Sequence, residues 1–168
     1  MNLEIRNEAA ADVDAIEVVT TAAFIAAPHT GHTEQFIVNA LRKAGKLAVS
    51  LVADVDGHVV GHVAVSPVSI SDGTAGWFGL GPISVAPAYQ GRGLGSRLMR
   101  EALRVLREGG ASGCVVLGEP SYYGRFGFRT EPGLDFPNVP PEYFQAVSFG
   151  AAIPSGSVSY DESFSAQA

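Results

Sequence analysis

The spacing of hydrophobic residues at the start of the chain predicts a strand followed by two helices. Residues 3–7 alternate between apolar and polar side chains, which is typical of a short strand. Residues 9–24 and 34–44 carry apolar side chains at helical spacing. Residues 25–33 contain proline, glycine and histidine without a period, so we expect a loop between the two helices.

A hairpin is predicted next. Residues 47–54 and 58–70 are strand-like, and Asp56-Gly57 between them is a strong signal for a two-residue turn. His58 and His62 are four positions apart on the second strand, so we expect them to share a face. A metal site there would need a further ligand of matching placement, and we expect no metal.

The central segment predicts a strand, a helix and a second strand. Residues 77–85 form an apolar strand, residues 93–108 an amphipathic helix that ends at a glycine pair, and residues 114–117 a short buried strand. One or two helical turns are expected over 120–126, after which Phe128 re-enters a strand.

Prolines interrupt the last part of the chain, where two strand-like pieces occur at 145–149 and 156–160. We expect a single α/β domain over residues 1–168, with a core at about 3–135 and a C-terminal strand extension at about 136–168. Its mixed, twisted sheet should carry helices on both faces.

The composition of the chain narrows the range of functions and partners that it can have. The 168 residues are 46% hydrophobic and 17% charged, which suffices for a core. A net charge of −6 without a run of Lys or Arg argues against a nucleic-acid partner and favours a cationic acceptor.

Cys114 lies alone in an apolar run, so we expect a core residue and a reducing compartment. Residues 1–6 lack an apolar signal segment, and no stretch reaches about 18 apolar residues, so we expect a soluble, cytoplasmic protein without a membrane partner.

The segment that carries chemistry is Gln90-x-x-Gly93-x-Gly95, where an apolar strand passes through a glycine turn into a helix. Unpaired N–H groups and the helix dipole favour an anion there, and a diphosphate is the natural guest. The Walker A pattern fails because no lysine follows the glycines. The G-x-G-x-x-G pattern fails because Ser96 or Leu98 stands where its last glycine belongs.

Together with Val85-Ala86-Pro87 before it, this loop resembles the acyl-CoA pyrophosphate loop of the GNAT superfamily. A second segment, Tyr123-Gly124-Arg125-Phe126-Gly127-Phe128, looks like the Y-x-x-x-G-F motif of that family, whose tyrosine commonly protonates the leaving CoA thiolate. The wider context is similar to the YhbS-like branch of predicted acetyltransferases, over roughly residues 3–135.

The resemblance implies a mostly antiparallel GNAT-like sheet and an N-acetyltransferase. The enzyme would move an acetyl group from acetyl-CoA to a primary amine of an unidentified small molecule or protein, by direct attack in a ternary complex. The residues that it places on acetyl-CoA are Ile83, Ser84, Val85, Gln90, Gly91, Arg92, Gly93, Leu94, Gly95 and Ser96.

For catalysis, the resemblance implies Tyr123 as general acid, with Tyr122 as substitute if the register shifts. Many relatives carry a glutamate on the strand before the loop, but residues 77–85 contain no carboxylate. Glu119, beside the tyrosines, is our candidate base, acting directly or through water. Backbone N–H groups near Ile83 would stabilise the oxyanion if a bulge turns them toward the ligand.

Other interpretations remain open. The missing strand carboxylate is compatible with a catalytically degenerate regulatory protein that binds acyl-CoA. His29 and His32 lie on the loop that borders the acceptor site in this family, and Arg92 and Arg97 either contact phosphates or are solvated. The C-terminal aromatic residues line an acceptor pocket, cover a sheet edge or form a homodimer contact; they are Phe136, Tyr143, Phe144 and Phe149.

Overall fold

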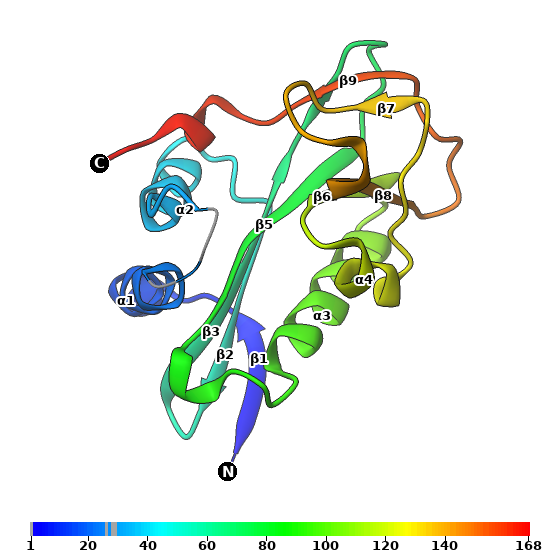
Figure 1. Ribbon diagram of the computed structural model, residues 1–168. Helices are drawn as coiled ribbons and strands as arrows, with labels where there is room; N and C mark the ends of the chain where they lie inside the picture. The colour runs from blue at the N-terminus through cyan, green and yellow to red at the C-terminus, as the bar shows by residue number, and fades with distance from the viewer. Residues whose placement is uncertain (1, 26, 28–29) are drawn as a thin grey trace.

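A computed structural model describes residues 2–25, 27 and 30–168 of the chain (Figure 1). A six-stranded sheet in the order β1-β2-β3-β5-β6-β8 runs through the molecule. Its strands are β1 Leu3–Asn7, β2 Val49–Val55, β3 His58–Pro67, β5 Trp77–Val85, β6 Gly113–Leu117 and β8 Phe144–Ser148. A second sheet of three short strands has the order β4-β9-β7, with β4 Ser69–Ile70, β9 Gly156–Ser159 and β7 Leu134–Asp135.

Helices cover both faces of the large sheet. Helices α1 Val13–Phe24 and α2 Glu34–Lys43 lie on one face, and α3 Leu94–Glu108 lies on the other (Figure 1). All neighbouring strands of this sheet run antiparallel except β5 and β6, which α3 joins in a parallel crossover. The predicted mixed, mostly antiparallel sheet with helices on both faces is confirmed. The short helix α4, Pro120–Tyr123, follows β6 at the position expected for helical turns.

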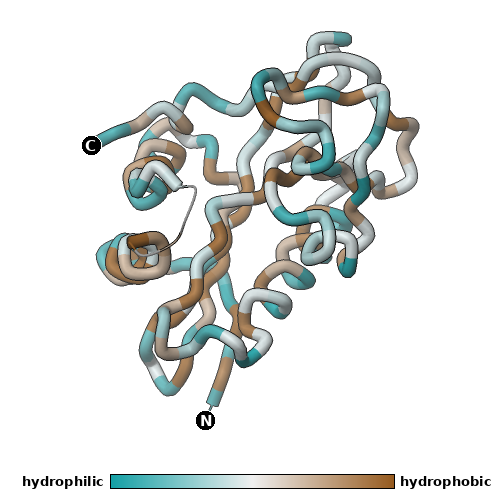
Figure 2. Tube along the Cα trace, in the orientation of Figure 1, coloured by the Kyte–Doolittle hydropathy of each residue, from teal (hydrophilic) through white to brown (hydrophobic). Residues whose placement is uncertain are grey.

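Apolar side chains on one face of each helix hold the helices against the sheet. The buried face of α3 consists of Leu94, Leu98, Met99, Ala102, Leu103 and Leu106. These side chains pack against alternate residues of β2 and β3, among them Leu51 and Val63, while Val52 and Ala64 point to the opposite face and meet α1 and α2. Figure 2 shows the hydrophobic positions concentrated along the central strands. Cys114 belongs to this core, as predicted, and burial raises the pKa of its thiol.

The hairpin forms as predicted, but one consequence drawn from its spacing is wrong. Asp56 and Gly57 take positive φ values of 52° and 88°, which a two-residue turn of this kind requires. Three residues of β3, from Val59 to Gly61, oppose only two of β2. Because this bulge inserts an extra residue, His58 is exposed while His62 is buried on the α1 side. The two histidines do not share a face, and the described residues contain no group of three metal-ligating side chains.

The predicted return of Phe128 to a strand is also wrong. Phe128 is buried in the core, but the segment makes only a single bridge, from Arg129 to Ala146. Strand β8, from the predicted C-terminal extension, takes the edge position beside β6 instead. Within the part of the chain that the structure describes, no helix has the length and apolar character needed to cross a membrane.

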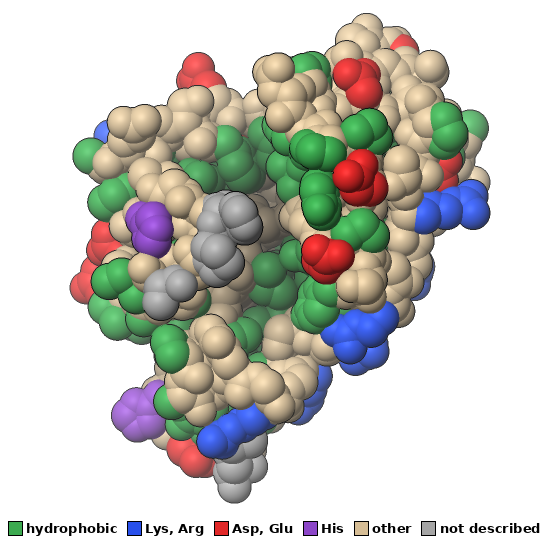
Figure 3. All heavy atoms as spheres, in the orientation of Figure 1, with side chains coloured by type: hydrophobic (Ala, Val, Ile, Leu, Met, Phe, Trp, Pro, Cys, Tyr) green, Lys and Arg blue, Asp and Glu red, His purple; other side chains and the backbone are tan. Residues whose placement is uncertain are grey.

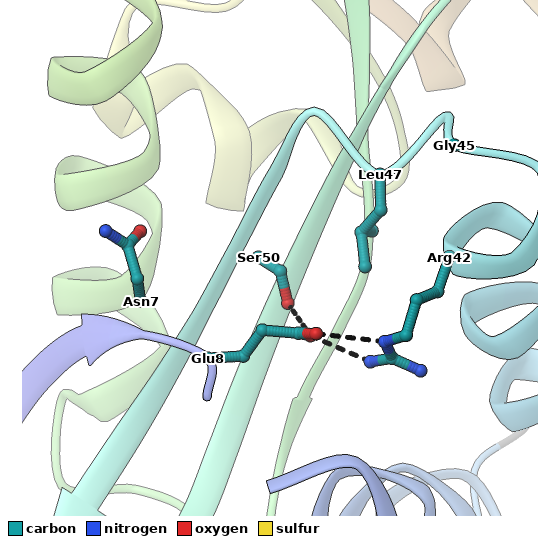
Figure 4. Close-up of a pocket in the computed structure, with 6 residues that line it drawn as sticks. All are labelled: Asn7, Glu8, Arg42, Gly45, Leu47 and Ser50. Carbon is teal, nitrogen blue, oxygen red and sulfur yellow. Dashed lines mark hydrogen bonds and ion pairs between the residues drawn. The ribbon is translucent and has the colours of Figure 1, made fainter. Parts of the chain in front are cut away.

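A chain of polar side chains on the α1 side of the sheet runs from the buried His62 to Glu8, and Figure 4 shows its outer part, where Glu8 meets Ser50 and Arg42. The His62 Nε2 atom lies 2.8 Å from Ser50 Oγ, and Ser50 donates to the Glu8 carboxylate. Arg42 also donates to Glu8, at 2.9 Å from Nε and 2.8 Å from Nη2. Burial lowers the pKa of His62 to about 4, so the imidazole is neutral at pH 7.

Stability should therefore fall as the pH drops from about 6.5 toward 4. In the unfolded chain, His62 binds a proton near its ordinary pKa of 6.5, whereas in the folded chain it binds one only near pH 4. The free energy of unfolding should therefore fall by roughly 2 kcal/mol between neutral pH and pH 5. Denaturant unfolding at pH 7.5, 6 and 5 measures this slope. His62→Gln should flatten the slope, and His58→Gln should keep the slope of the parent protein. An unchanged slope in His62→Gln would contradict the assignment.

Candidate active site

A glycine-rich loop connects β5 to α3. The side-chain amide of Gln90 donates to the Val85 carbonyl at 3.0 Å, which ties the loop to the end of the strand. Gly91 and Gly93 have φ values of 76° and 80°, a conformation that favours glycine. Gly93 is the N-cap of α3 and provides no side-chain cap. The N–H groups of the first turn of α3 therefore remain available to a ligand.

This helix end opens into a pocket of about 300 Å³. Its lining consists of Val85, Tyr89, Gln90, Gly91, Gly93, Leu94, Gly95, Ser96, Tyr122 and Arg125. Among the described residues, this lining holds one cation and no carboxylate. The Arg125 guanidinium lies 4.5 Å from the centroid of the Tyr122 ring and 3.4 Å from Ser96 Oγ. With the positive end of the α3 dipole beside it, this pocket, called here the loop pocket, favours an anion.

Most of the residues predicted to contact the cofactor converge on the loop pocket, and three do not. Arg92 is exposed and stacks on Tyr89 at 5.4 Å. Ser84 is buried on the α1 side, 3.4 Å from the Thr20 hydroxyl. Ile83 lines a second pocket, described below.

Strand β5 leaves β6 halfway along its length. The two strands pair only from Trp77 to Gly79, whereas β5 stays paired with β3 as far as Val85. A bulge allows this, because four β5 residues from Leu80 to Ile83 oppose only three of β3. Beyond Gly79, the β5 edge that faced β6 has no strand partner among the described residues. The bulge that the oxyanion hypothesis required is present.

A second pocket, of about 330 Å³, lies where the strands part. The side chains and backbone that line it come from α1, α2, β5, β6, α4 and the C-terminal segment: Phe24, Glu34, Ile37, Leu80, Gly81, Pro82, Ile83, Leu117, Tyr123, Tyr160 and Phe164. We call it the thioester pocket. The molecule is visibly hollowed with hydrophobic side chains in the hollow on the face shown in Figure 3.

Tyr123 enters the thioester pocket from α4. Its ring meets Tyr122 edge-on at 5.0 Å and Phe128 at 6.1 Å. A side chain at Gly118 would overlap the Tyr123 ring, so the glycine permits this close approach. Burial, with a smaller contribution from Tyr122, raises the pKa of the Tyr123 phenol to about 12. The phenol therefore keeps its proton at working pH and can serve as a donor.

The two carboxylates near Tyr123 occupy different settings. Glu119 precedes α4, is exposed and lines neither pocket. Glu34, in the first turn of α2, lines the thioester pocket and accepts a hydrogen bond from Thr30 at 3.4 Å. His32 is exposed and lines neither pocket, and His29 lies outside the described residues.

Arg125, Glu34 and Tyr160 are among the pocket residues that were not singled out from the sequence. Arg125 could have been found, because it lies inside the tyrosine motif that follows β6. Glu34 and Tyr160 come from distant segments without a motif, so only the fold brings them to β5.

Comparison with known proteins agrees with this geometry. The acetyltransferase (GNAT) family profile matches residues 14–128. The uncharacterized N-acetyltransferase YhbS of Escherichia coli K12 is 42% identical over 97 residues, which span 57% of this chain and 58% of that protein.

Two solved structures share the fold over nearly the whole chain. A GNAT family acetyltransferase from Brucella melitensis, in complex with acetyl-CoA, is 46% identical with a TM-score of 0.87, covering 97% of this chain and 98% of that chain. YhbS from Escherichia coli, in complex with CoA, is 32% identical with a TM-score of 0.87, and the match covers 98% of this chain and 93% of that chain. The chain belongs to the acetyltransferase (GNAT) family and is homologous to YhbS.

Proposed function

We propose that this protein is an N-acetyltransferase that moves the acetyl group of acetyl-CoA to a primary amine. One observation carries the proposal: a single unpaired stretch of β5 joins the two pockets. Val85 borders the loop pocket at one end, and Leu80 to Ile83 border the thioester pocket at the other. An extended ligand with a diphosphate at one end and a thioester at the other fits this arrangement.

The residues around the loop fit the diphosphate of CoA. The free N–H groups of the α3 first turn and the Arg125 guanidinium would hold it, with Gly91, Gly93 and Gly95 allowing close approach. Residues Ile83 to Val85 would pair with the amides of the pantetheine arm, as an added strand does. The relatives from Brucella melitensis and Escherichia coli, seen with acetyl-CoA and CoA, support this choice of ligand.

The chemistry then follows from the thioester pocket. An amine that enters beside Glu34 loses a proton to the Glu34 carboxylate. The amine then attacks the acyl carbon, which forms the C–N bond. The C–S bond breaks, the thiolate takes the proton of the Tyr123 phenol, and the tyrosinate regains a proton from the nitrogen of the adduct through solvent. Holding the two substrates together supplies much of the acceleration. Glu119, the base proposed from the sequence, would act through water, whereas Glu34 already lines the pocket.

A glutamate in the loop tests the cofactor assignment. Gly93→Glu puts a negative charge and a strained side chain beside the expected diphosphate, so calorimetric affinity for acetyl-CoA should fall at least ~10-fold. Gly110→Glu is the matched control, because Gly110 has a φ of 87° and open space at the other end of α3. Failure of the parent protein to bind acetyl-CoA would refute the proposal.

Removal of one phenolic oxygen tests the general acid. Tyr123→Phe should lower kcat by about 10²-fold with little change in acetyl-CoA affinity, since the lost group acts on the leaving thiolate. Tyr122→Phe should instead weaken acetyl-CoA binding, because its hydroxyl lies beside Gly95 in the loop pocket. Steady-state kinetics with calorimetry separate the two effects. Unchanged turnover in Tyr123→Phe would remove the tyrosine from the mechanism, and tight binding without turnover of any amine by the parent protein would favour a regulatory acyl-CoA-binding protein.

A pair of isosteric substitutions tests the base. Glu34→Gln should lower kcat/KM by about 10²-fold, because the amide cannot accept the proton of the amine. Glu119→Gln should cost only about 3-fold, since its side chain is exposed and would act through water. The reverse order of effects, read from pH–rate profiles of both variants, would assign the base to Glu119.

A further inference from the structure

We propose that the hydroxyl of Tyr160 donates a hydrogen bond to the acyl oxygen of the bound thioester. This inference rests on the proposed function and adds a catalytic residue to it. Tyr160 follows β9 near the end of the chain and lines the thioester pocket together with Tyr123. No motif in the sequence singles it out.

The position of the Tyr160 ring is set by a glycine of β5. A Cβ atom on Gly79 would lie 2.7 Å from Cε2 and 3.2 Å from Cζ of Tyr160, so the hydroxyl end of the ring rests directly over Gly79. Gly79 is the last β5 residue paired with β6. The phenol therefore ends at the point where the two strands part and the thioester pocket begins.

Two neighbouring rings hold this orientation. Phe136 meets the Tyr160 ring edge-on at 5.3 Å and 75°, and Phe164 meets it at 4.9 Å and 73°. Edge-to-face contacts on two sides restrict the ring before any ligand arrives. Donors fixed in advance are those that stabilise charge most effectively during a reaction.

The hydroxyl itself lacks a partner. Its oxygen is buried, and it makes no hydrogen bond with any residue in the described part of the protein. Buried tyrosine hydroxyls ordinarily find a partner, so this one indicates a ligand group that completes the site. Burial also raises the pKa of the Tyr160 phenol, which keeps it protonated as a donor.

The acyl oxygen is the ligand atom that suits this donor. As the amine attacks, the carbonyl oxygen gains negative charge, and it loses that charge again when the C–S bond breaks. The bulge of β5 beside it includes Pro82, which has no N–H to offer. A side-chain donor over Gly79 would add to the backbone N–H groups that the other residues of the bulge retain. Tyr160 only donates a hydrogen bond, while the proton for the thiolate comes from Tyr123.

A binding comparison tests the contact without knowledge of the acceptor. Calorimetry would measure the affinities of the parent protein, Tyr160→Phe and Tyr143→Phe for acetyl-CoA and for CoA. The parent protein should prefer acetyl-CoA, and Tyr160→Phe should lose about 3- to 10-fold of that preference, as expected for one neutral hydrogen bond. Tyr143 is 40% exposed and lies outside both pockets, so Tyr143→Phe should keep the preference.

Kinetics and thermal unfolding complete the test. Tyr160→Phe should lower kcat by about 10²-fold, as loss of one oxyanion donor does. Its unbound form should melt no lower than the parent, because the deleted hydroxyl has no protein partner. Unchanged ligand preference and unchanged turnover in Tyr160→Phe would overturn the inference and assign the hydroxyl to a bound water. Absence of acetyl-CoA binding by the parent protein would instead refute the proposed function.

Discussion

The parting of β5 from β6 after Gly79 is the constraint on which the rest of the site depends. Backbone N–H and C=O groups in the middle of a sheet normally pair with a neighbouring strand, and dry unpaired groups are costly. Here β3 holds one edge of β5 through the bulge, while the other edge is released as far as Val85. A ligand that lies along this edge would supply the missing pairs, so the released edge of β5 suits an extended ligand.

The two ends of that edge differ in electrostatic character. The loop pocket combines the α3 N-terminus with Arg125 and contains no carboxylate, whereas the thioester pocket is mainly apolar with Glu34 as its acidic residue. This difference would orient an asymmetric ligand that carries a diphosphate at one end. The reactive end is left among apolar side chains, where a single hydrogen bond or carboxylate has a larger effect than in water.

Features encoded by short stretches of sequence could be predicted, and features that depend on distant pairing could not. The glycine loop, α3 and the tyrosine motif are local, since turn chemistry and helical period act over a few residues. The shared face expected for His58 and His62 failed because the β3 bulge shifts the register by one residue. Gly61 inside the bulge is a residue type that often marks such a shift, but it does not fix where the extra residue goes. The strand expected at Phe128 failed because β8, from much later in the chain, occupies the edge of β6.

The same contrast separates the two tyrosines of the thioester pocket. Tyr123 lies six residues after the end of β6 and reaches the pocket through a short helix. Tyr160 arrives from the C-terminal segment, and its ring fits there because Gly79 lacks a side chain. Burial raises both pKa values, which makes each phenol a neutral donor. The roles proposed for them differ with location, since Tyr123 lies on α4 and Tyr160 lies at the junction of β5 and β6. Because the C-terminal segment also brings Phe164 to the pocket, changes there would alter the lining of the pocket and the proposed Tyr160 donor together.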